Sequence, residues 1–356
     1  MNVLTVIDYL GSGGPSYVAI RTASALINAG HKVSFIVLYN DVSIAIDPAI
    51  NVITLNLEAT KSYRSKYTTY LHNYVHNLEK EEPFDLILVH LSHSIHLLKA
   101  YHHTHVYHYI HNTLSRESTD GYSFFKGQLK LFKLRLQHKN LNLIAVSKGV
   151  QDDATHVVKI KPKSIQTIYN PINMNAIQTL ANKENTMDGK DYIIHIGRFV
   201  AQKRHDRLIK AYQKSGITAK LLLIGEGPLK GETEALVKTL KLTDKVLFHN
   251  PVQNPYPYIK SAKVLVLSSD YEGLGLVLLE ALALGVPVIS TDCPHGPKEI
   301  FENYNPENLV ALDEDTLAQQ IQKVYTTPEL YKPDPSCLNP FSYQVIAKAF
   351  EKLAKT

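Results

Sequence analysis

Short apolar runs rich in Val, Ile and Leu alternate with longer amphipathic stretches along the whole chain. This alternation is typical of βαβ units, in which buried parallel strands are joined by helices. In the first half, the predicted strands are residues 3–7, 33–38, 52–57, 86–89, 105–110, 143–146 and 165–168. After a polar segment at residues 180–191 the pattern starts again, with predicted strands at residues 192–196, 220–224, 246–248, 264–267, 286–290 and 309–311. The sequence therefore predicts an α/β protein with two doubly wound, Rossmann-like domains.

The length of 356 residues agrees with two domains. We expect an N-terminal domain over residues 1–172, a linker and hinge over 173–190, and a C-terminal domain over 191–338. Residues 339–356 carry apolar side chains at helical spacing, which predicts a terminal helix that crosses back to the N-terminal domain.

Composition narrows the class of protein. Hydrophobic residues make up 44% and charged residues 20% of the chain, as in folded globular proteins. The two cysteines do not form a disulfide framework or a zinc motif, and Asp8 interrupts any signal-peptide core. The longest nearly apolar run, residues 273–290, has Glu280 at its centre and predicts no membrane span. We expect a cytoplasmic protein whose surplus of five positive charges lies in its first half.

A glycine-rich turn follows the first predicted strand. It reads Gly11-Ser12-Gly13-Gly14-Pro15-Ser16 and leads into a helical pattern, so its backbone N–H groups can face an anion. A dinucleotide-binding loop is an alternative, but Ser16 stands where that motif has glycine. A purely structural tight turn is the other alternative.

The second half has two further unusual turns after predicted strands. Arg198 and Lys203 lie five residues apart in a turn that Gly197 starts, and two such cations can bind a diphosphate. The next predicted strand ends in Gly225-Glu226-Gly227-Pro228. Ligands of parallel sheets bind at the carboxyl ends of the strands, where these turns lie.

Residues 268–300 carry the strongest pattern. Glu272 and Glu280 flank a glycine-containing helix start, where Gly273 and Gly275 let a ligand approach the backbone. Burying Glu280 in an otherwise apolar helix requires partners, and ribose hydroxyls are suitable ones.

Together these motifs resemble the family 4 retaining glycosyltransferases of the GT-B fold, over essentially the whole chain. The matching residues are the Gly13-Gly14 loop, His111 in HYIHN, Ser147 in AVSKG, Asn170 in IYNP, Arg198 and Lys203 in HIGRFVAQK, Gly225-Glu226-Gly227, and Glu272 and Glu280 in EGLGLVLLE. Each match alone is weak, but their order and their placement after strands make the joint match specific. The resemblance implies two Rossmann-like domains that face each other across a cleft.

The resemblance also implies roles for the matched residues. Arg198 and Lys203 would bind the diphosphate of a nucleotide sugar, Glu280 the ribose hydroxyls and Glu272 the transferred sugar. Gly13 and Gly14 would close over the diphosphate, and His111 would lie beside the reacting carbon. The other implied donor-binding residues are Gly197, Gly225, Phe248, Val252, Gly273, Leu274, Gly275 and Leu276, with the base near the turn at residues 248–253.

For the reaction, the resemblance implies transfer of a hexose or N-acetylhexosamine with retention. UDP is the default nucleotide and GDP stays open. Arg198, Lys203 and a helix terminus can replace a divalent metal, so we expect no cofactor. Retention can use a carboxylate nucleophile or a same-face attack by the acceptor. The resemblance favours the same-face route, with Glu272 as a positioning group.

Two segments bear on the substrates. Where the family usually has glycine in the base-binding turn, this chain has Asn250, which tolerates left-handed dihedral angles. Residues 292–300, DCPHGPKEI, resemble the version in bacterial transferases that build lipopolysaccharide, O-antigen, capsule and related surface glycans. The expected acceptor is therefore a hydroxyl of such a glycan.

Three other segments allow two interpretations each. Asp313-Glu314-Asp315 looks like a metal-binding DxD motif, but we interpret it as a helix start. The histidines between residues 90 and 111 suggest a metal site, but they mix strand and loop positions, and we predict none. Residues 124–139 are basic and apolar, which fits either contact with an anionic inner membrane or an ordinary half-buried helix.

Other functional classes stay open at this level. A nucleotide-sugar epimerase or phosphorylase shares the architecture and acts without a glycan acceptor. A non-catalytic binding protein retains the fold, although the intact charged motifs argue against it. An NAD-dependent oxidoreductase is distinguished by the nucleotide it binds.

Overall fold

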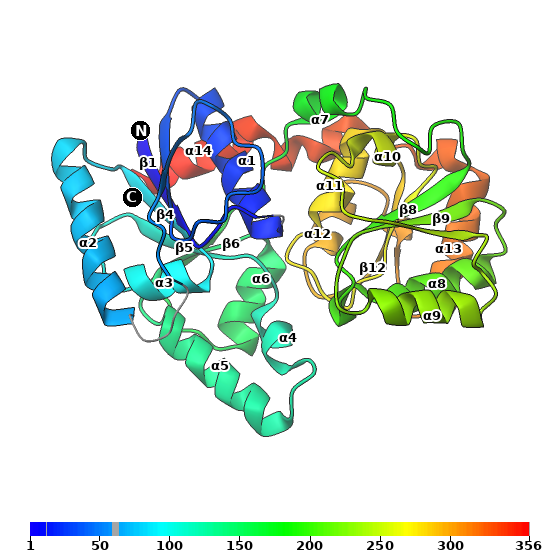
Figure 1. Ribbon diagram of the computed structural model, residues 1–356, viewed down its shortest axis with the longest axis horizontal. Coiled ribbons are helices and arrows are strands. Elements are labelled where there is room, and N and C mark those ends of the chain that lie inside the picture. Colours follow the sequence, from blue (N-terminus) through cyan, green and yellow to red (C-terminus); the bar gives the residue numbers. More distant parts are fainter. Residues whose placement is uncertain (12, 59–63, 356) are drawn as a thin grey trace. The chain divides into compact units, whose positions relative to one another are not determined.

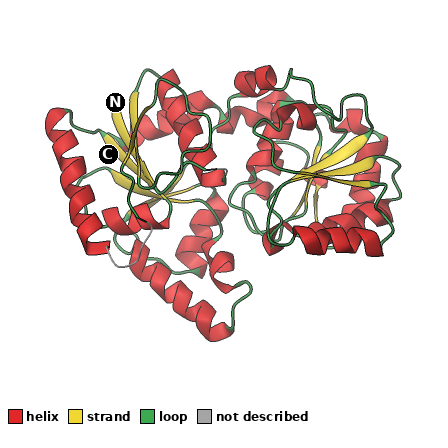
Figure 2. Ribbon diagram, in the orientation of Figure 1, coloured by secondary structure: helices red, strands yellow, loops and turns green. Residues whose placement is uncertain are grey.

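The computed structural model describes residues 1–11, 13–58 and 64–355. The chain forms two compact units (Figure 1). Unit 1 comprises Met1–Pro171 together with Pro340–Thr356, and unit 2 comprises Ile172–Asn339. In both units, helices lie on the two faces of a central sheet (Figure 2). Unit 1 is therefore built from two separate stretches of sequence, and unit 2 from one.

Unit 1 contains a seven-stranded parallel sheet in the order β3-β2-β1-β4-β5-β6-β7. The strands are β1 Asn2–Ile7, β2 Lys32–Val37, β3 Asn51–Thr54, β4 Leu86–His90, β5 Val106–Ile110, β6 Asn142–Ala145 and β7 Ser164–Thr167. The helices are α1 Gly14–Asn28, α2 Arg64–Glu81, α3 Ser92–Leu98, α4 Leu114–Thr119, α5 Phe124–His138, α6 Lys148–Asp152 and α14 Tyr343–Leu353.

Unit 2 contains a six-stranded parallel sheet in the order β10-β9-β8-β11-β12-β13. The strands are β8 Tyr192–Ile196, β9 Lys220–Ile224, β10 Val246–His249, β11 Leu265–Leu267, β12 Val288–Thr291 and β13 Leu309–Val310. The helices are α7 Met174–Leu180, α8 His205–Ser215, α9 Lys230–Thr239, α10 Tyr256–Lys260, α11 Leu276–Ala283, α12 Pro297–Phe301 and α13 Glu314–Thr326. Its core includes Phe199, Leu208 and Tyr212.

The α/β fold predicted from the apolar pattern is confirmed, and every predicted strand is present with its ends displaced by at most a few residues. Residues 173–190, predicted as a linker, include helix α7 and belong to unit 2. The C-terminal helix α14 belongs to unit 1, where it contacts α1. It buries Ile346, Phe350 and Leu353.

The strand orders place one switch point in each unit. In unit 2 the chain builds outward from β8 to β10, and then returns to add β11 on the other side of β8. In unit 1 the corresponding step lies between β1 and β4. Ligands of doubly wound sheets bind beyond the carboxyl ends of the strands at such points. The segments after β8 and β11, and after β1 and β4, are therefore the places to look for function.

No described helix has the length and apolar character needed to cross a bilayer.

Candidate functional site

Lys203 and Glu272 meet at the switch point of unit 2. Lys203 lies in the turn after β8, and Glu272 lies in the loop after β11. The Lys203 Nζ atom donates to Glu272 Oε1 at 2.6 Å, and Ser269 Oγ donates to the same oxygen at 2.6 Å. The two charged side chains are 19% and 8% exposed. Removing one partner from such a buried pair leaves the other charge uncompensated.

A second group of charges fixes the backbone around this pair. Arg204 donates to both carboxylate oxygens of Asp270, at 3.2 and 3.1 Å, and Arg207 donates to Asp270 at 2.6 Å. Arg207 also donates to the Ser268 carbonyl oxygen at 2.9 Å. The Ser268 hydroxyl in turn donates to the Lys203 carbonyl oxygen. The turn that carries Lys203 is thus tied to the loop that carries Glu272.

Two neutral histidines lie beneath the turn. His195 is fully buried, and its Nδ1 atom is 2.8 Å from the Val266 carbonyl oxygen. Its ring meets that of His205 edge to face, and Phe199 stacks on His205 with ring centroids 4.1 Å apart. Burial lowers the pKa of His195 to about 4 and the pKa of His205 to about 2. The rings of His195 and His205 near Lys203 are therefore uncharged at neutral pH.

Glycine lets the turns after β8 and β9 touch. A Cβ atom on Gly225 would lie 2.0 Å from the Gly197 carbonyl oxygen, and one on Gly227 would lie 2.5 Å from the Phe199 carbonyl oxygen. No side chain fits at either position. The two turns also exchange hydrogen bonds, since Phe199 donates to the Glu226 carbonyl oxygen and Leu229 to that of Phe199.

Arg198 projects from the same turn and is exposed. Its side chain forms no hydrogen bond or ion pair with the described residues. The two cations predicted from the sequence therefore differ in the structure, because Lys203 is paired and half-buried while the Arg198 guanidinium group faces solvent.

Helix α11 begins beside the Lys203–Glu272 pair. Gly275 precedes the helix with φ at 90°, a left-handed conformation that glycine adopts without strain. The first N–H groups of a helix have no partner within it and carry the positive end of its dipole. Leu274 is buried, Leu276 is partly exposed, and Glu280 is half-buried little more than one turn into the helix.

The turn predicted to bind the base follows β10. Phe248 and Val252 are both partly buried, and the Phe248 ring lies 6.0 Å from that of Phe199. Asn250 has no positive φ, so the turn forms without the left-handed geometry that asparagine tolerates. Its side chain instead accepts a hydrogen bond from Lys230 Nζ at 2.8 Å.

In unit 1, Gly13 caps helix α1 and Gly14 is its first residue. Space beside Gly14 is open, since a Cβ atom there would meet nothing within 4 Å. The neighbouring Asp8 was not among the predicted site residues; its buried carboxylate accepts from the backbone N–H and hydroxyl of Ser94, both at 2.6 Å. Burial raises the Asp8 pKa. This carboxylate joins the end of β1 to α3 across the switch point.

His111 follows β5 and belongs to a stack of three rings. Its Nε2 atom lies 3.0 Å from His90 Nδ1, and its ring is nearly parallel to that of Tyr109. Desolvation lowers the His111 pKa to about 3, so the ring is neutral at physiological pH. His111 Nδ1 is buried and has no hydrogen-bond partner among the described residues.

The remaining motifs have structural roles. Asp313 caps helix α13 by accepting from the N–H groups of Asp315 and Thr316, as the helix-start interpretation predicts. Ser147 caps α6 by accepting from Val150 N, and Asn170 is buried. Across the described ranges, no cluster of three or more His, Cys, Asp or Glu residues is arranged to hold a metal.

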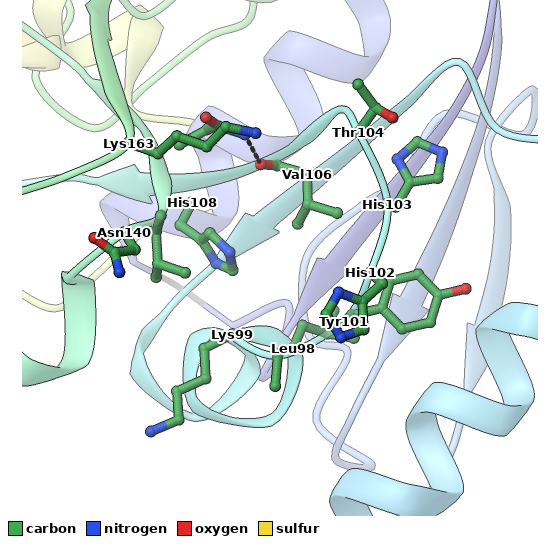
Figure 3. Close-up of a pocket in the computed structure, with 13 residues that line it drawn as sticks. Leu98, Lys99, Tyr101, His102, His103, Thr104, Val106, His108, Asn140 and Lys163 are labelled. Atoms are coloured by element: carbon green, nitrogen blue, oxygen red, sulfur yellow. Dashed lines mark hydrogen bonds between the residues drawn. The ribbon is translucent and has the colours of Figure 1, made fainter.

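A separate pocket of about 520 Å³ lies at the amino ends of the unit 1 strands, away from the carboxyl ends that carry the Gly13-Gly14 turn and His111 (Figure 3). It is lined by residues at the amino ends of β5 and β6, including His102, His108 and Asn140. Burial lowers the His108 pKa to about 3. Neither Gly13 nor His111 lines this pocket.

The chain thus has two doubly wound units and a lysine–carboxylate pair at a glycine-lined switch point. The family described as "Glycosyl transferases group 1" matches residues 176–333, and "Glycosyltransferase Family 4" matches residues 12–176. The two matches adjoin at residue 176, and the chain belongs to the family 4 glycosyltransferases.

Individual relatives have modest sequence identity to this chain. The chain is 32% identical to an N-acetylgalactosamine-N,N'-diacetylbacillosaminyl-diphospho-undecaprenol 4-alpha-N-acetylgalactosaminyltransferase of Campylobacter jejuni, over 64% of this chain and 62% of that protein. It is 26% identical to the N-acetyl-alpha-D-glucosaminyl L-malate synthase of Bacillus anthracis, over 91% and 87%. The solved structure of Anabaena HepE in complex with UDP and glucose shares the fold, with a TM-score of 0.76, 16% identity and full coverage of both chains.

Proposed function

We propose that this protein is a retaining glycosyltransferase that moves a hexose or N-acetylhexosamine from a UDP-sugar to a hydroxyl of a growing bacterial surface glycan. The observation that carries the proposal is the Lys203–Glu272 pair at the switch point of unit 2. In this pair a cation and the carboxylate that we assign to the sugar lie side by side, at the point where doubly wound sheets bind ligands.

The donor diphosphate is assigned to Lys203, Arg198 and the amino end of α11. A lysine ammonium group has three donors, so Lys203 can contact a phosphate oxygen while it still contacts Glu272. Breaking the bond between sugar and diphosphate builds negative charge on the leaving phosphate. Fixed cations and helix N–H groups stabilise that charge. Because these groups supply the positive charge, we propose that the reaction needs no metal.

Contacts to the sugar and ribose are assigned to the two glutamates. Glu272 accepts two hydrogen bonds at one oxygen, which holds the carboxylate in place and makes that oxygen a weaker nucleophile. This supports a positioning role for Glu272 and attack by the acceptor on the same face as the leaving phosphate. Glu280, half-buried on α11, would accept from the ribose hydroxyls.

His111 and the Gly13-Gly14 turn are assigned to contacts made by unit 1. A neutral His111 can exchange a hydrogen bond with a sugar hydroxyl but adds no positive charge to an oxocarbenium-like centre. Gly14 leaves space for a ligand to reach the backbone at the start of α1.

The acceptor assignment rests on similarity. Residues 292–300 resemble transferases of lipopolysaccharide, O-antigen and capsule synthesis, and the name of the Campylobacter relative includes a sugar-diphospho-undecaprenol acceptor. A cytoplasmic location belongs to the same proposal, and the two buried, unpaired cysteines are in keeping with a reducing compartment.

Calorimetric titration of the purified protein with UDP, GDP and NAD in excess EDTA tests the proposal. We expect UDP to bind without metal and NAD to give no heat of binding. Binding of GDP alone would change the nucleotide and keep the site. Binding of NAD alone, or of a nucleotide only after metal is restored, would contradict the proposed chemistry.

A further inference from the structure

Helix α5 exposes a continuous apolar stripe. Phe125, Leu129, Phe132 and Leu136 recur at intervals of four, three and four residues, and such positions lie on one side of a helix. Their exposed fractions are 83%, 54%, 53% and 57%. Soluble proteins seldom leave large apolar side chains so exposed in a row, and a contiguous patch of this kind marks an interaction site.

The opposite side of α5 packs onto unit 1. Gly127, Leu131 and His138 are buried there. A Cβ atom on Gly127 would lie 3.3 Å from the Thr119 side chain, so the glycine permits close contact with the end of α4. In Figure 1, α5 lies at the periphery of unit 1. The stripe therefore faces outward because the helix is anchored by its other side.

Lysines border the stripe along one flank. Lys126, Lys130 and Lys133 project between the outward and the buried sides, as the helical period of 3.6 residues requires. Lys130 Nζ lies 3.3 Å from the centre of the Tyr122 ring, and Tyr122 is itself 46% exposed. Residues 121–140 contain no Asp or Glu. The outward surface of α5 is thus apolar along the stripe, and its charged residues on the lysine flank are all basic.

We propose that α5 is a membrane-docking helix that lies in the interface of an anionic bilayer, with the apolar stripe inserted among the acyl chains and the three lysines on lipid phosphates. Phenylalanine and leucine on one face with lysine beside them are typical of interfacial helices. Each lysine near an anionic surface adds attraction that falls with ionic strength. This proposal goes beyond donor chemistry and does not depend on it.

Charge complementarity selects an anionic bilayer over a second copy of the chain. Two copies meeting through this stripe would bring together two sets of lysines with no carboxylate from residues 121–140 between them, and such like charges repel. Lipid phosphates supply the missing negative charge.

Vesicle co-sedimentation of the full-length protein tests the proposal. We expect binding to phosphatidylcholine vesicles that contain about one quarter phosphatidylglycerol, and weak binding to phosphatidylcholine alone. The triple variant Lys126→Glu/Lys130→Glu/Lys133→Glu and the variant Phe125→Ser/Phe132→Ser should each reduce the vesicle affinity by at least about tenfold. Added salt should weaken binding of the unmodified protein.

Matched controls alter exposed residues of unit 2. Lys220→Glu/Lys238→Glu/Lys245→Glu makes the same change in net charge, and Leu312→Ser/Leu330→Ser removes exposed apolar side chains elsewhere. We expect both controls to bind vesicles like the unmodified protein. UDP titration should be unchanged in every variant, so a failed membrane proposal is separable from a failed donor site.

Fluorescence gives a second readout, because the chain contains no tryptophan. Phe125→Trp should show a blue-shifted emission on addition of the anionic vesicles, and Leu330→Trp should not. The proposal is overturned if the protein stays in solution with anionic vesicles, or if the α5 variants bind like the controls. Concentration-dependent dimerisation that is lost in Phe125→Ser/Phe132→Ser, without vesicle binding, would instead assign the stripe to a second copy.

Discussion

Lys203 serves two purposes that a substitution can separate. It compensates the buried Glu272 carboxylate, and in the proposed function it also binds the donor diphosphate. The first purpose concerns stability, since an unpaired buried charge is destabilising. The second concerns affinity for the nucleotide.

We expect Lys203→Ala to lower the free energy of unfolding by roughly 3 kcal/mol and to weaken UDP binding at least tenfold, or about 1.4 kcal/mol. Urea denaturation measures the first effect and calorimetry the second. The double variant Lys203→Ala/Glu272→Gln should recover much of the stability without recovering affinity. If UDP binds the folded Lys203→Ala protein with unchanged affinity, the diphosphate assignment is wrong.

Glu280 provides a test that depends on one hydroxyl group. If its carboxylate holds the ribose, the protein should prefer UDP to 2'-deoxy-UDP, since the deoxy nucleotide lacks the hydroxyl group that would donate to the carboxylate. We predict that Glu280→Ala weakens UDP binding at least tenfold and removes the preference. Competition titrations with the two nucleotides measure it. A preference that survives in Glu280→Ala would place the ribose elsewhere.

At the scale of elements, the site depends on how closely the turns after β8 and β9 approach. The contact between Gly225 and the Gly197 carbonyl oxygen is between backbone atoms, which cannot move aside as a flexible side chain can. We predict that Gly225→Ala forces the turns apart, lowers the free energy of unfolding by about 2 kcal/mol or more, and impairs UDP binding. Urea denaturation and calorimetry test this.

Gly231→Ala is the matched control. It lies in helix α9, where a Cβ atom would meet nothing within 4 Å. Alanine should be neutral there or stabilising by up to about 1 kcal/mol. Equal destabilisation by the two substitutions would mean that the close approach of the turns is not the cause.

Most elements could be predicted because many strands are short runs of Val, Ile and Leu that are almost wholly buried, as in β4 and β9. Their exact ends could not, since they depend on hydrogen bonds to neighbouring strands: β12 starts at Val288, although the apolar run begins at Val286. Helix α5 was open between two interpretations. Its periodicity shows two apolar sides, and only packing on α4 decides which side is buried.

Sequence motifs identify the candidate site residues one by one, but not the network that joins them. Arg198, Lys203, Glu272 and Glu280 were all identified from motifs. The ion pair between Lys203 and Glu272 joins residues 69 positions apart and appears only once β8 and β11 are neighbours. Asp270 and Ser269 carry a signal in retrospect, as polar residues directly after a buried strand.

At the scale of the whole molecule, buried histidines make stability depend on pH. Desolvation lowers the pKa of His90, His108, His111, His195 and His205, to about 3 for His111 and about 4 for His195. In the unfolded chain a histidine titrates near pH 6.5. Below that pH the unfolded state binds protons that the folded state does not, so stability falls as the pH falls.

We predict that the free energy of unfolding decreases steeply between about pH 6.5 and 4, by about 1.4 kcal/mol per pH unit for each such histidine. Urea denaturation at a series of pH values measures the slope. His205→Gln should reduce the slope by about one proton. An unchanged slope in His205→Gln would show that this ring is protonated when folded.

Unit 1 is interrupted in sequence, and this affects the order in which a nascent chain can mature. The ribosome makes all of unit 2 before it reaches residues 343–353, so unit 2 can fold while unit 1 still lacks α14. Until then, the side of α1 that α14 covers has no partner. A message truncated just before α14 would therefore yield a complete second unit attached to an unfinished first one, which is a candidate for chaperone binding and proteolysis.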